Sequence, residues 1–132
     1  MRKIKYKAWS KDLEEFLNIT GFECINGEIT GIFHDGDYIG YDKDDIALLQ
    51  YIGINDVDGK EIYEGYIVDT VYGGILKRYI VVWDDSELDF KGTNGKENYG
   101  HKFEYLQCCE EIKVVGSIYQ NPDLLNQEWA FD

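Results

Sequence analysis

Residues 67–83 read IVDTVYGGILKRYIVVW, and this stretch decides the fold class. Two runs rich in β-branched and aromatic residues, 67–72 and 75–83, flank Gly73-Gly74. Such runs favour β-strands, and a two-residue glycine connection favours a tight hairpin turn because both of its positions require positive φ angles. The stretch therefore predicts a β-hairpin, and with it a mainly β fold of the barrel or sandwich class.

Other segments of the chain repeat the strand signals. Asn26-Gly27 between two apolar runs predicts a second hairpin by the same turn chemistry. Residues 46–52 and 112–119 predict further strands, and 13–19 allow either a strand or a short helix, with the strand favoured. The sequence Asn121-Pro122-Asp123 supplies an N-cap, a first-turn proline and a favourable charge, so a short C-terminal helix is expected from residue 122.

Two regions are expected along the chain. A polar, glycine- and aspartate-rich connection covers residues 36–45, so we predict an N-terminal β-hairpin region over 1–45 and a second region over 46–132. Within the second region, residues 91–100 hold three glycines and two asparagines. This composition loses much backbone entropy on ordering and offers little to bury, so 91–100 is expected to be a mobile loop.

Charge is distributed unevenly in this 132-residue chain of net charge −13. The first 11 residues carry five basic and no acidic side chains, whereas the remaining residues carry eight basic and 26 acidic ones, a charge of −18. Such an acidic body repels phosphate backbones, so nucleic-acid binding is not expected. The sequence shows no apolar stretch long enough for a membrane span and no signal-peptide core, which predicts a cytoplasmic protein without membrane contact.

The N-terminal segment alternates basic and apolar residues with a period of two. This spacing predicts a strand with Ile4, Tyr6 and Ala8 toward the core and with basic residues on the other face. Three outcomes remain open for the basic face: docking on the chain's own body, docking on a neighbouring subunit, or solvation. The basic residues concerned are Lys3, Lys5 and Lys7.

The densest acidic group follows the strand that ends at Trp83, and its members are Asp84, Asp85, Glu87 and Asp89. Carboxylates so close together could hold magnesium for phosphoryl chemistry. No arginine, lysine or histidine is evident nearby to stabilise developing charge, so a solvated turn is the favoured interpretation.

A calcium loop is suggested by Asp56, Asp58 and Gly59, but it fails on spacing. With Gly59 at loop position six, Ile54 stands at position one and Gly65 at position twelve, where oxygen ligands are required. A polar β-turn is expected instead.

Nucleophilic and cofactor chemistry finds little support. The cysteines, Cys24, Cys108 and Cys109, form no C-x-x-C pair and are expected to be free thiols. If the adjacent pair lies on a strand, one thiol should be buried and the other partly exposed. The two histidines, His34 and His101, are expected at the surface. Because no nucleophile, phosphate-binding or dinucleotide motif is present, we assign no catalytic, cofactor-binding or metal-binding residue and favour a non-enzymatic protein.

Several motifs in one order resemble the YopX family of bacteriophage and prophage proteins. The matching segments are 4–9 (IKYKAW), 48–54 (LLQYIGI), 58–65 (DGKEIYEG), 67–68 (IV), 81–85 (VVWDD) and 115–125 (VGSIYQNPDLL). One departure is Tyr66, where the family commonly has aspartate. The resemblance implies a mainly β fold with an SH3-like β-barrel in the C-terminal part, from a phage or prophage of low-GC Gram-positive bacteria, and implies no catalytic residues.

The sequence supports three hypotheses for the function. Eleven tyrosines and three tryptophans suit either a β core or a protein interface. The leading hypothesis is a phage accessory protein that acts by protein–protein contacts, with itself as a homo-oligomer or with a host or phage protein. One alternative is an acidic DNA mimic that blocks a host nucleic-acid-binding protein. The other is a magnesium-dependent phosphoesterase built on the acidic group of residues 84–89.

Overall fold

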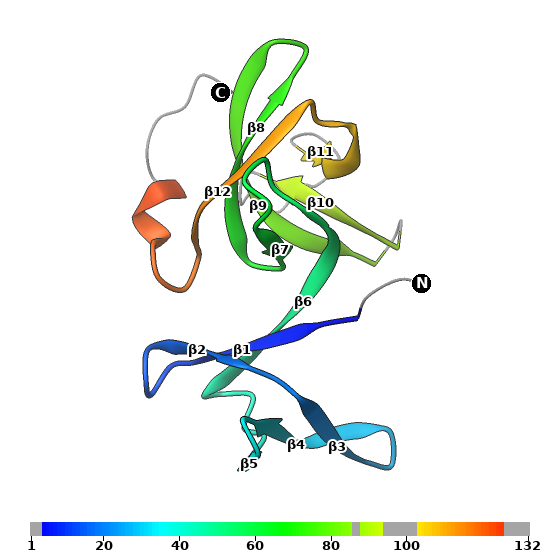
Figure 1. Ribbon diagram of the computed structural model, residues 1–132, viewed down its shortest axis with the longest axis vertical. Coiled ribbons are helices and arrows are strands. Elements are labelled where there is room, and N and C mark those ends of the chain that lie inside the picture. The colour runs from blue at the N-terminus through cyan, green and yellow to red at the C-terminus, as the bar shows by residue number, and fades with distance from the viewer. Residues whose placement is uncertain (1–3, 86–87, 94–102, 126–132) are drawn as a thin grey trace. The chain divides into compact units, whose positions relative to one another are not determined.

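The structure, a computed structural model, describes residues 4–85, 88–93 and 103–125 (Figure 1). It is mainly β, as the sequence predicts, with short 3-10 helices as its only helical elements in these ranges. The chain divides into two compact units, Met1–Tyr51 and Ile52–Asp132. The division falls within one long strand, further along the chain than residue 45. In the described part of the chain no helix is long and apolar enough to cross a membrane.

Unit 1 contains two antiparallel groups of strands. Strand β1 lies between β2 and the first part of β6, and β4 lies between β3 and β5. Ala8, Leu17, Ile32 and Ile46 form its buried core. The bounds of these strands are β1 Tyr6–Ser10, β2 Glu15–Asn18, β3 Gly21–Ile25, β4 Glu28–His34, β5 Asp37–Gly40 and β6 Ile46–Asn55. The predicted hairpin at Asn26-Gly27 is confirmed, with φ angles of 54° and 81°.

Two expectations for unit 1 are wrong. Residues 37–40 form strand β5 rather than a polar connection, because Asp35-Gly36 makes a two-residue turn with φ angles of 48° and 86°. Both angles are positive, as in the Asn26-Gly27 turn, so the chain reverses and pairs with β4. Ile4 does not face the core: its side chain is 67% exposed because it precedes β1.

Unit 2 is built on a curled five-stranded antiparallel sheet in the order β11-β10-β9-β8-β12. Strand β7 lies beside β6. The predicted hairpin at Gly73-Gly74 is confirmed, because Tyr72 pairs with Ile75 across that turn. The elements are β7 Glu61–Tyr63, β8 Tyr66–Tyr72, β9 Ile75–Asp84, β10 Asp89–Thr93, β11 Phe103–Tyr105, η1 Leu106–Cys108, β12 Glu111–Ser117 and η2 Pro122–Leu125. Fully buried apolar side chains fill the core: Ile62, Ile67, Val68, Val81 and Leu106.

The expected mobile loop at 91–100 is wrong for its first three residues. Lys91, Gly92 and Thr93 are buried in β10, and residues 94–100 lie outside the described residues. Gly92 belongs there because of close packing: a Cβ at this position would lie 2.9 Å from Tyr79 Cβ and 3.1 Å from Leu106 Cδ2. The C-terminal element begins at Pro122, as predicted, and is a 3-10 helix.

Replacing Gly92 with alanine should destabilise unit 2, because the added methyl has no room between Tyr79 and Leu106. We expect a loss of about 1–3 kcal/mol in the free energy of unfolding, measured by urea denaturation. Gly40→Ala is the matched control, since no atom lies within 4 Å of a Cβ placed there. It should change stability by less than about 1 kcal/mol. Equal effects of the two substitutions would contradict this packing argument.

Candidate functional site

The acidic group after Trp83 contains a buried ion pair. Lys91 Nζ lies 2.7 Å from Asp84 Oδ2, and the two side chains are only 3% and 9% exposed. The β9–β10 register pairs Asp84 with Asp89 and Val82 with Lys91, so Asp84 and Lys91 are diagonal neighbours on one face. Lys91 Nζ also lies 5.2 Å from the centre of the Tyr105 ring. The expectation that no basic residue lies near these acids is therefore wrong.

The other described acids of this group have separate partners. Asp85 accepts a 2.6 Å hydrogen bond from the Trp83 indole, and Asp89 accepts bonds from its neighbour Phe90 and from Gln107. Glu87 lies outside the described residues. Across the described residues, no three histidine, cysteine or acidic side chains gather in a way that could hold a metal ion. The geometry thus favours structural roles for Asp84, Asp85 and Asp89.

Asp56 is the centre of the predicted β-turn. Its Oδ1 accepts the backbone N–H groups of Asp58 and Lys60 at 2.9 and 2.8 Å, and Gly59 N–H donates to the Asp56 carbonyl. Its Oδ2 accepts the N–H of Val114 on β12 at 3.0 Å. The next residue, Val57, donates its N–H to the carbonyl of Ile112. The turn therefore lies along β12, and both oxygens of the Asp56 carboxylate accept hydrogen bonds from backbone N–H groups.

The ionisation of Asp56 follows from this environment. Burial raises the pKa of the Asp56 carboxyl, but hydrogen bonds from the N–H groups of Val114, Lys60 and Asp58 lower it. The positive charge of Lys60 lowers it further, so the pKa lies below its ordinary value of 3.8. The group is ionised at neutral pH and serves as an acceptor for backbone donors.

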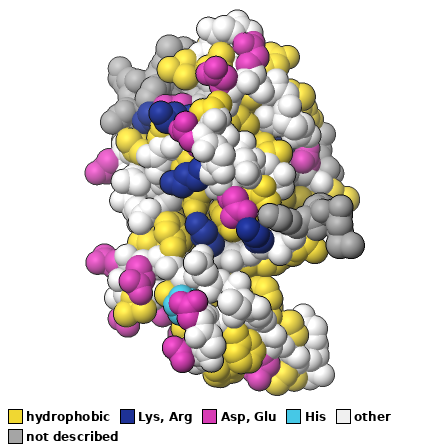
Figure 2. Space-filling model, in the orientation of Figure 1, with side chains coloured by type: hydrophobic (Ala, Val, Ile, Leu, Met, Phe, Trp, Pro, Cys, Tyr) yellow, Lys and Arg dark blue, Asp and Glu magenta, His cyan; other side chains and the backbone are white. Residues whose placement is uncertain are grey.

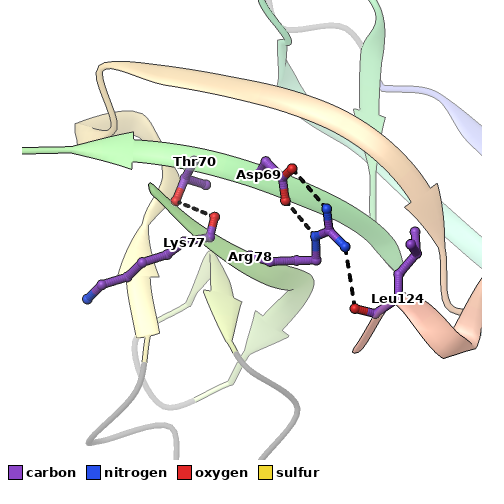
Figure 3. A network of polar contacts seen from close by, with 5 residues as sticks. All are labelled: Asp69, Thr70, Lys77, Arg78 and Leu124. Atoms are coloured by element: carbon purple, nitrogen blue, oxygen red, sulfur yellow. Dashed lines mark hydrogen bonds and ion pairs between the residues drawn. The ribbon is translucent and has the colours of Figure 1, made fainter. Parts of the chain in front are cut away.

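A second network ties the C-terminal segment to the sheet (Figure 3). Asp69 and Arg78 are directly opposite on β8 and β9, and the guanidinium Nε and Nη2 donate to the two carboxylate oxygens at 2.6 and 3.0 Å. Arg78 Nη1 also donates to the Leu124 carbonyl at 3.5 Å. Counting back from the Gly73-Gly74 turn brings Asp69 opposite Arg78, so the hairpin register was the signal that could have identified this pair.

The remaining candidate residues are scattered. His34 donates from Nδ1 to the Asn18 carbonyl, and His101 lies outside the described residues. Cys24 and Cys108 are exposed and Cys109 is half-buried, all as free thiols. The expectation of one buried thiol on a strand is wrong, because residues 106–108 form a 3-10 helix in which Leu106 takes the buried position.

Lys7 of the basic N-terminal strand packs against its own unit. Lys7 is half-buried with its Nζ 5.7 Å from the centre of the Phe16 ring, whereas Lys5 is exposed and Lys3 lies outside the described residues. On the opposite face Ala8 is fully buried, and Tyr6 packs against Phe22 with ring centres 5.0 Å apart.

Exposed apolar side chains gather at the end of the β8–β9 hairpin. Tyr72, Ile75 and Leu76, here called the hairpin end, are 51%, 55% and 51% exposed. Tyr72 and Ile75 are opposite each other, and Leu76 pairs with Val71 on the other face of the hairpin. Glu110 holds the turn by accepting the Gly73 N–H at 2.7 Å. In the face drawn in Figure 2, hydrophobic side chains likewise reach the surface among acidic ones.

The chain is similar to known proteins in sequence and in fold. The family model described as YopX protein matches residues 5–126. The chain belongs to the YopX family. Its fold is similar to that of protein EF1440 from Enterococcus faecalis, with a TM-score of 0.69 and 21% identity over 95% of this chain and 99% of that one. It is also similar to protein yopX from Bacillus subtilis, with a TM-score of 0.60 and 18% identity over 98% and 100% of the two chains. No curated protein matches the chain.

Some of the residues in the YopX motif segments serve the architecture of unit 2. A Cβ on Gly65, which has φ of 81°, would lie 2.9 Å from the Tyr119 ring, and a Cβ on Gly116 would lie 2.6 Å from Asn121 Oδ1. Tyr66, the departure from the family pattern, is buried against Tyr63 with ring centres 5.6 Å apart. In this YopX-family chain, these motif positions are explained by packing and turns.

Removing one member of the buried ion pair should be strongly destabilising. Asp84→Ala leaves the Lys91 ammonium buried without its carboxylate, and we expect a loss of about 3–5 kcal/mol in chemical denaturation. The double variant Asp84→Leu with Lys91→Met removes both charges and should recover most of that stability. A double variant as unstable as the single one would show that the pair is not the main source of the effect.

Asp56 should control the acid stability of unit 2. Asp56→Asn keeps one acceptor oxygen but presents an N–H₂ group to Val114, so we expect a loss of about 2 kcal/mol at pH 7. Because the folded-state pKa is lowered, the carboxylate stabilises the fold above its ordinary value of 3.8 and loses this effect as pH falls through the folded value. Thermal melts from neutral to acidic pH should therefore show a weaker pH dependence in Asp56→Asn. Asp58→Asn, in the same turn, is the control and should behave like the unaltered chain.

Proposed function

We propose that this YopX-family chain is a phage or prophage accessory protein that acts by protein–protein contacts as a homo-oligomer in the cytoplasm of the bacterial host. Family membership supports the phage context, because the YopX family is one of bacteriophage and prophage proteins. A host or phage protein is the other class of partner.

The hairpin end carries the proposal. Large apolar side chains that are more than half exposed on both faces of one hairpin cannot all be covered by the sheet they belong to. Burying such side chains is favourable by about 25 cal/mol per Å² of apolar surface, and aromatic residues are enriched at interface cores. The Glu110 carboxylate accepts the Gly73 N–H and so holds the backbone of the turn between these side chains, which lowers the entropic cost of association.

We also propose that unit 2 is an SH3-like barrel and that residues 1–45 form an N-terminal β-hairpin region. The curl of the five-stranded sheet and the antiparallel order of its strands support the first assignment. The pairing of β1 with β2 and of β3 with β4 supports the second. Small barrels host many unrelated binding functions, so the assignment fits a contact role without specifying the partner.

A DNA mimic is the second candidate function. Residues 21–42 hold five acidic residues and no lysine or arginine, so this segment of unit 1 carries a formal charge of one sign. Such a surface could occupy the basic groove of a host nucleic-acid-binding protein. Binding of this kind should weaken steeply with salt and should compete with DNA, and salt-insensitive binding would exclude it.

Light scattering at micromolar concentration tests the oligomer. The unaltered chain should have a mass that is a multiple of 15.3 kDa. Serine at Tyr72, Ile75 and Leu76 together should give the mass of one chain with an unchanged circular dichroism spectrum. Serine at Leu13, Ile25 and Val57, whose exposure is similar, is the matched control and should keep the oligomer. A single-chain mass for the unaltered protein would overturn the homo-oligomer.

A further inference from the structure

One face of the three-stranded sheet of unit 1 carries an exposed aromatic pair. Phe33 on β4 and Tyr38 on β5 are direct cross-strand partners, with ring centres 5.5 Å apart and planes at 61°. They are 37% and 51% exposed. Gly31 and Gly40 form the next pair on the same face of these two strands, so no large side chain stands beside the rings at that pair.

The Tyr38 ring lies across the sheet over Gly31. A Cβ on Gly31 would lie 2.3 Å from Tyr38 Cε2, so the absence of a side chain on β4 allows the ring to rest on the backbone. The hydroxyl then reaches β3, where it donates to Glu23 Oε1 at 2.9 Å. One face of the ring is thus against the sheet while the side chain as a whole stays half exposed.

The Glu23 carboxylate beside this ring is held in a fixed orientation. Its Oε1 also accepts a 2.7 Å hydrogen bond from Thr30 Oγ1. The bonds from Thr30 and Tyr38 lower the pKa of Glu23, so the group is ionised at neutral pH. Its second oxygen, Oε2, accepts no hydrogen bond within the described residues, and so an oriented negative oxygen faces solvent next to an aromatic ring.

The segment that forms this sheet carries formal charge of one sign. Between Gly21 and Gly40 the chain has four acidic residues and no lysine or arginine. These acidic residues are Glu23, Glu28, Asp35 and Asp37. An aromatic ring with an exposed face attracts cations, and a carboxylate oxygen accepts strong hydrogen bonds from guanidinium and ammonium groups.

We propose that Phe33, Tyr38 and Glu23 form a cradle for a cationic side chain, and that its occupant is an arginine- or lysine-rich extended segment of a partner protein. A guanidinium stacked on Tyr38 can donate to Glu23 Oε2 while its aliphatic stem contacts Phe33. The acids at the two turns of the sheet attract the neighbouring basic residues of the same segment. The cradle lies in unit 1 and shares no residue with the hairpin end.

The probe is a hexa-arginine peptide, titrated into the full-length chain by calorimetry at low salt and followed by amide chemical shifts. We expect saturable binding with shifts concentrated on β3–β5. Glu23→Gln should weaken binding about fivefold or more, because it removes the oriented charge. Tyr38→Phe keeps the ring but removes one of the two hydrogen bonds that orient the carboxylate, so a smaller loss of about threefold is expected. Both substitutions are conservative, and circular dichroism checks that each variant folds.

Glu28→Gln is the matched control, because it removes one charge from the same sheet at the Asn26-Gly27 turn, away from the rings. It should weaken binding by less than about twofold. Equal losses for Glu23→Gln and Glu28→Gln would overturn the cradle in favour of a diffuse acidic surface. Shifts confined to unit 2, or no saturable binding, would also overturn it. Light scattering on the same samples reports the oligomer separately, so failure of the cradle is distinguishable from failure of the proposed homo-oligomer.

Discussion

The Asp56 carboxylate is the group on which the contact between the turn at residues 56–60 and strand β12 depends. Its Oδ1 holds the turn at residues 56–60 by accepting the N–H groups of Asp58 and Lys60, and its Oδ2 joins the turn to β12 by accepting the N–H of Val114. With the bond from Val57 to Ile112, the turn acts as a short partner for the outer edge of β12. An uncovered strand edge invites pairing with other chains, and a buried N–H without an acceptor is costly. One side chain therefore shapes a turn and protects an edge.

Local turn chemistry explains what could be predicted from the sequence. Asn26-Gly27 and Gly73-Gly74 specify their hairpins because positive φ at two adjacent residues is a local property. Asp35-Gly36 has the same chemistry, but it lies in a polar run that hid the short strand β5. That Lys91 and Gly92 belong to a buried strand could not be inferred locally. The Lys91 charge is neutralised by Asp84, and the close approach of Tyr79 and Leu106 leaves no room for a side chain at Gly92.

The acidic residues show why density along the sequence is a poor guide to a metal site. Asp84, Asp85 and Asp89 are close in the chain, yet their carboxylates have different partners. Asp84 accepts a hydrogen bond from a buried lysine and Asp85 from an indole, whereas Asp89 accepts from a side-chain amide and from a backbone N–H. Alternation turns Asp85 away from Asp84, whereas Asp89 is directly opposite Asp84 and Lys91 is its diagonal neighbour on the same face. Glu23 also has an oriented carboxylate with an open oxygen, yet it stands alone in its stretch of sequence. Its setting depends on Thr30 and Tyr38 from two other strands.

In this chain, the residues of the family motifs are distinct from the exposed side chains of the hairpin end and of the aromatic cradle. Within unit 2, the motif residues Gly65 and Gly116 leave room for Tyr119 and Asn121. The fold is similar to that of the two solved structures at 21% and 18% identity. The hairpin end and the aromatic cradle lie outside the motif segments. Their exposed side chains contribute little to the core, so they can change without loss of the fold. A fold held together in this way can stay the same while the surfaces outside the motifs differ between proteins.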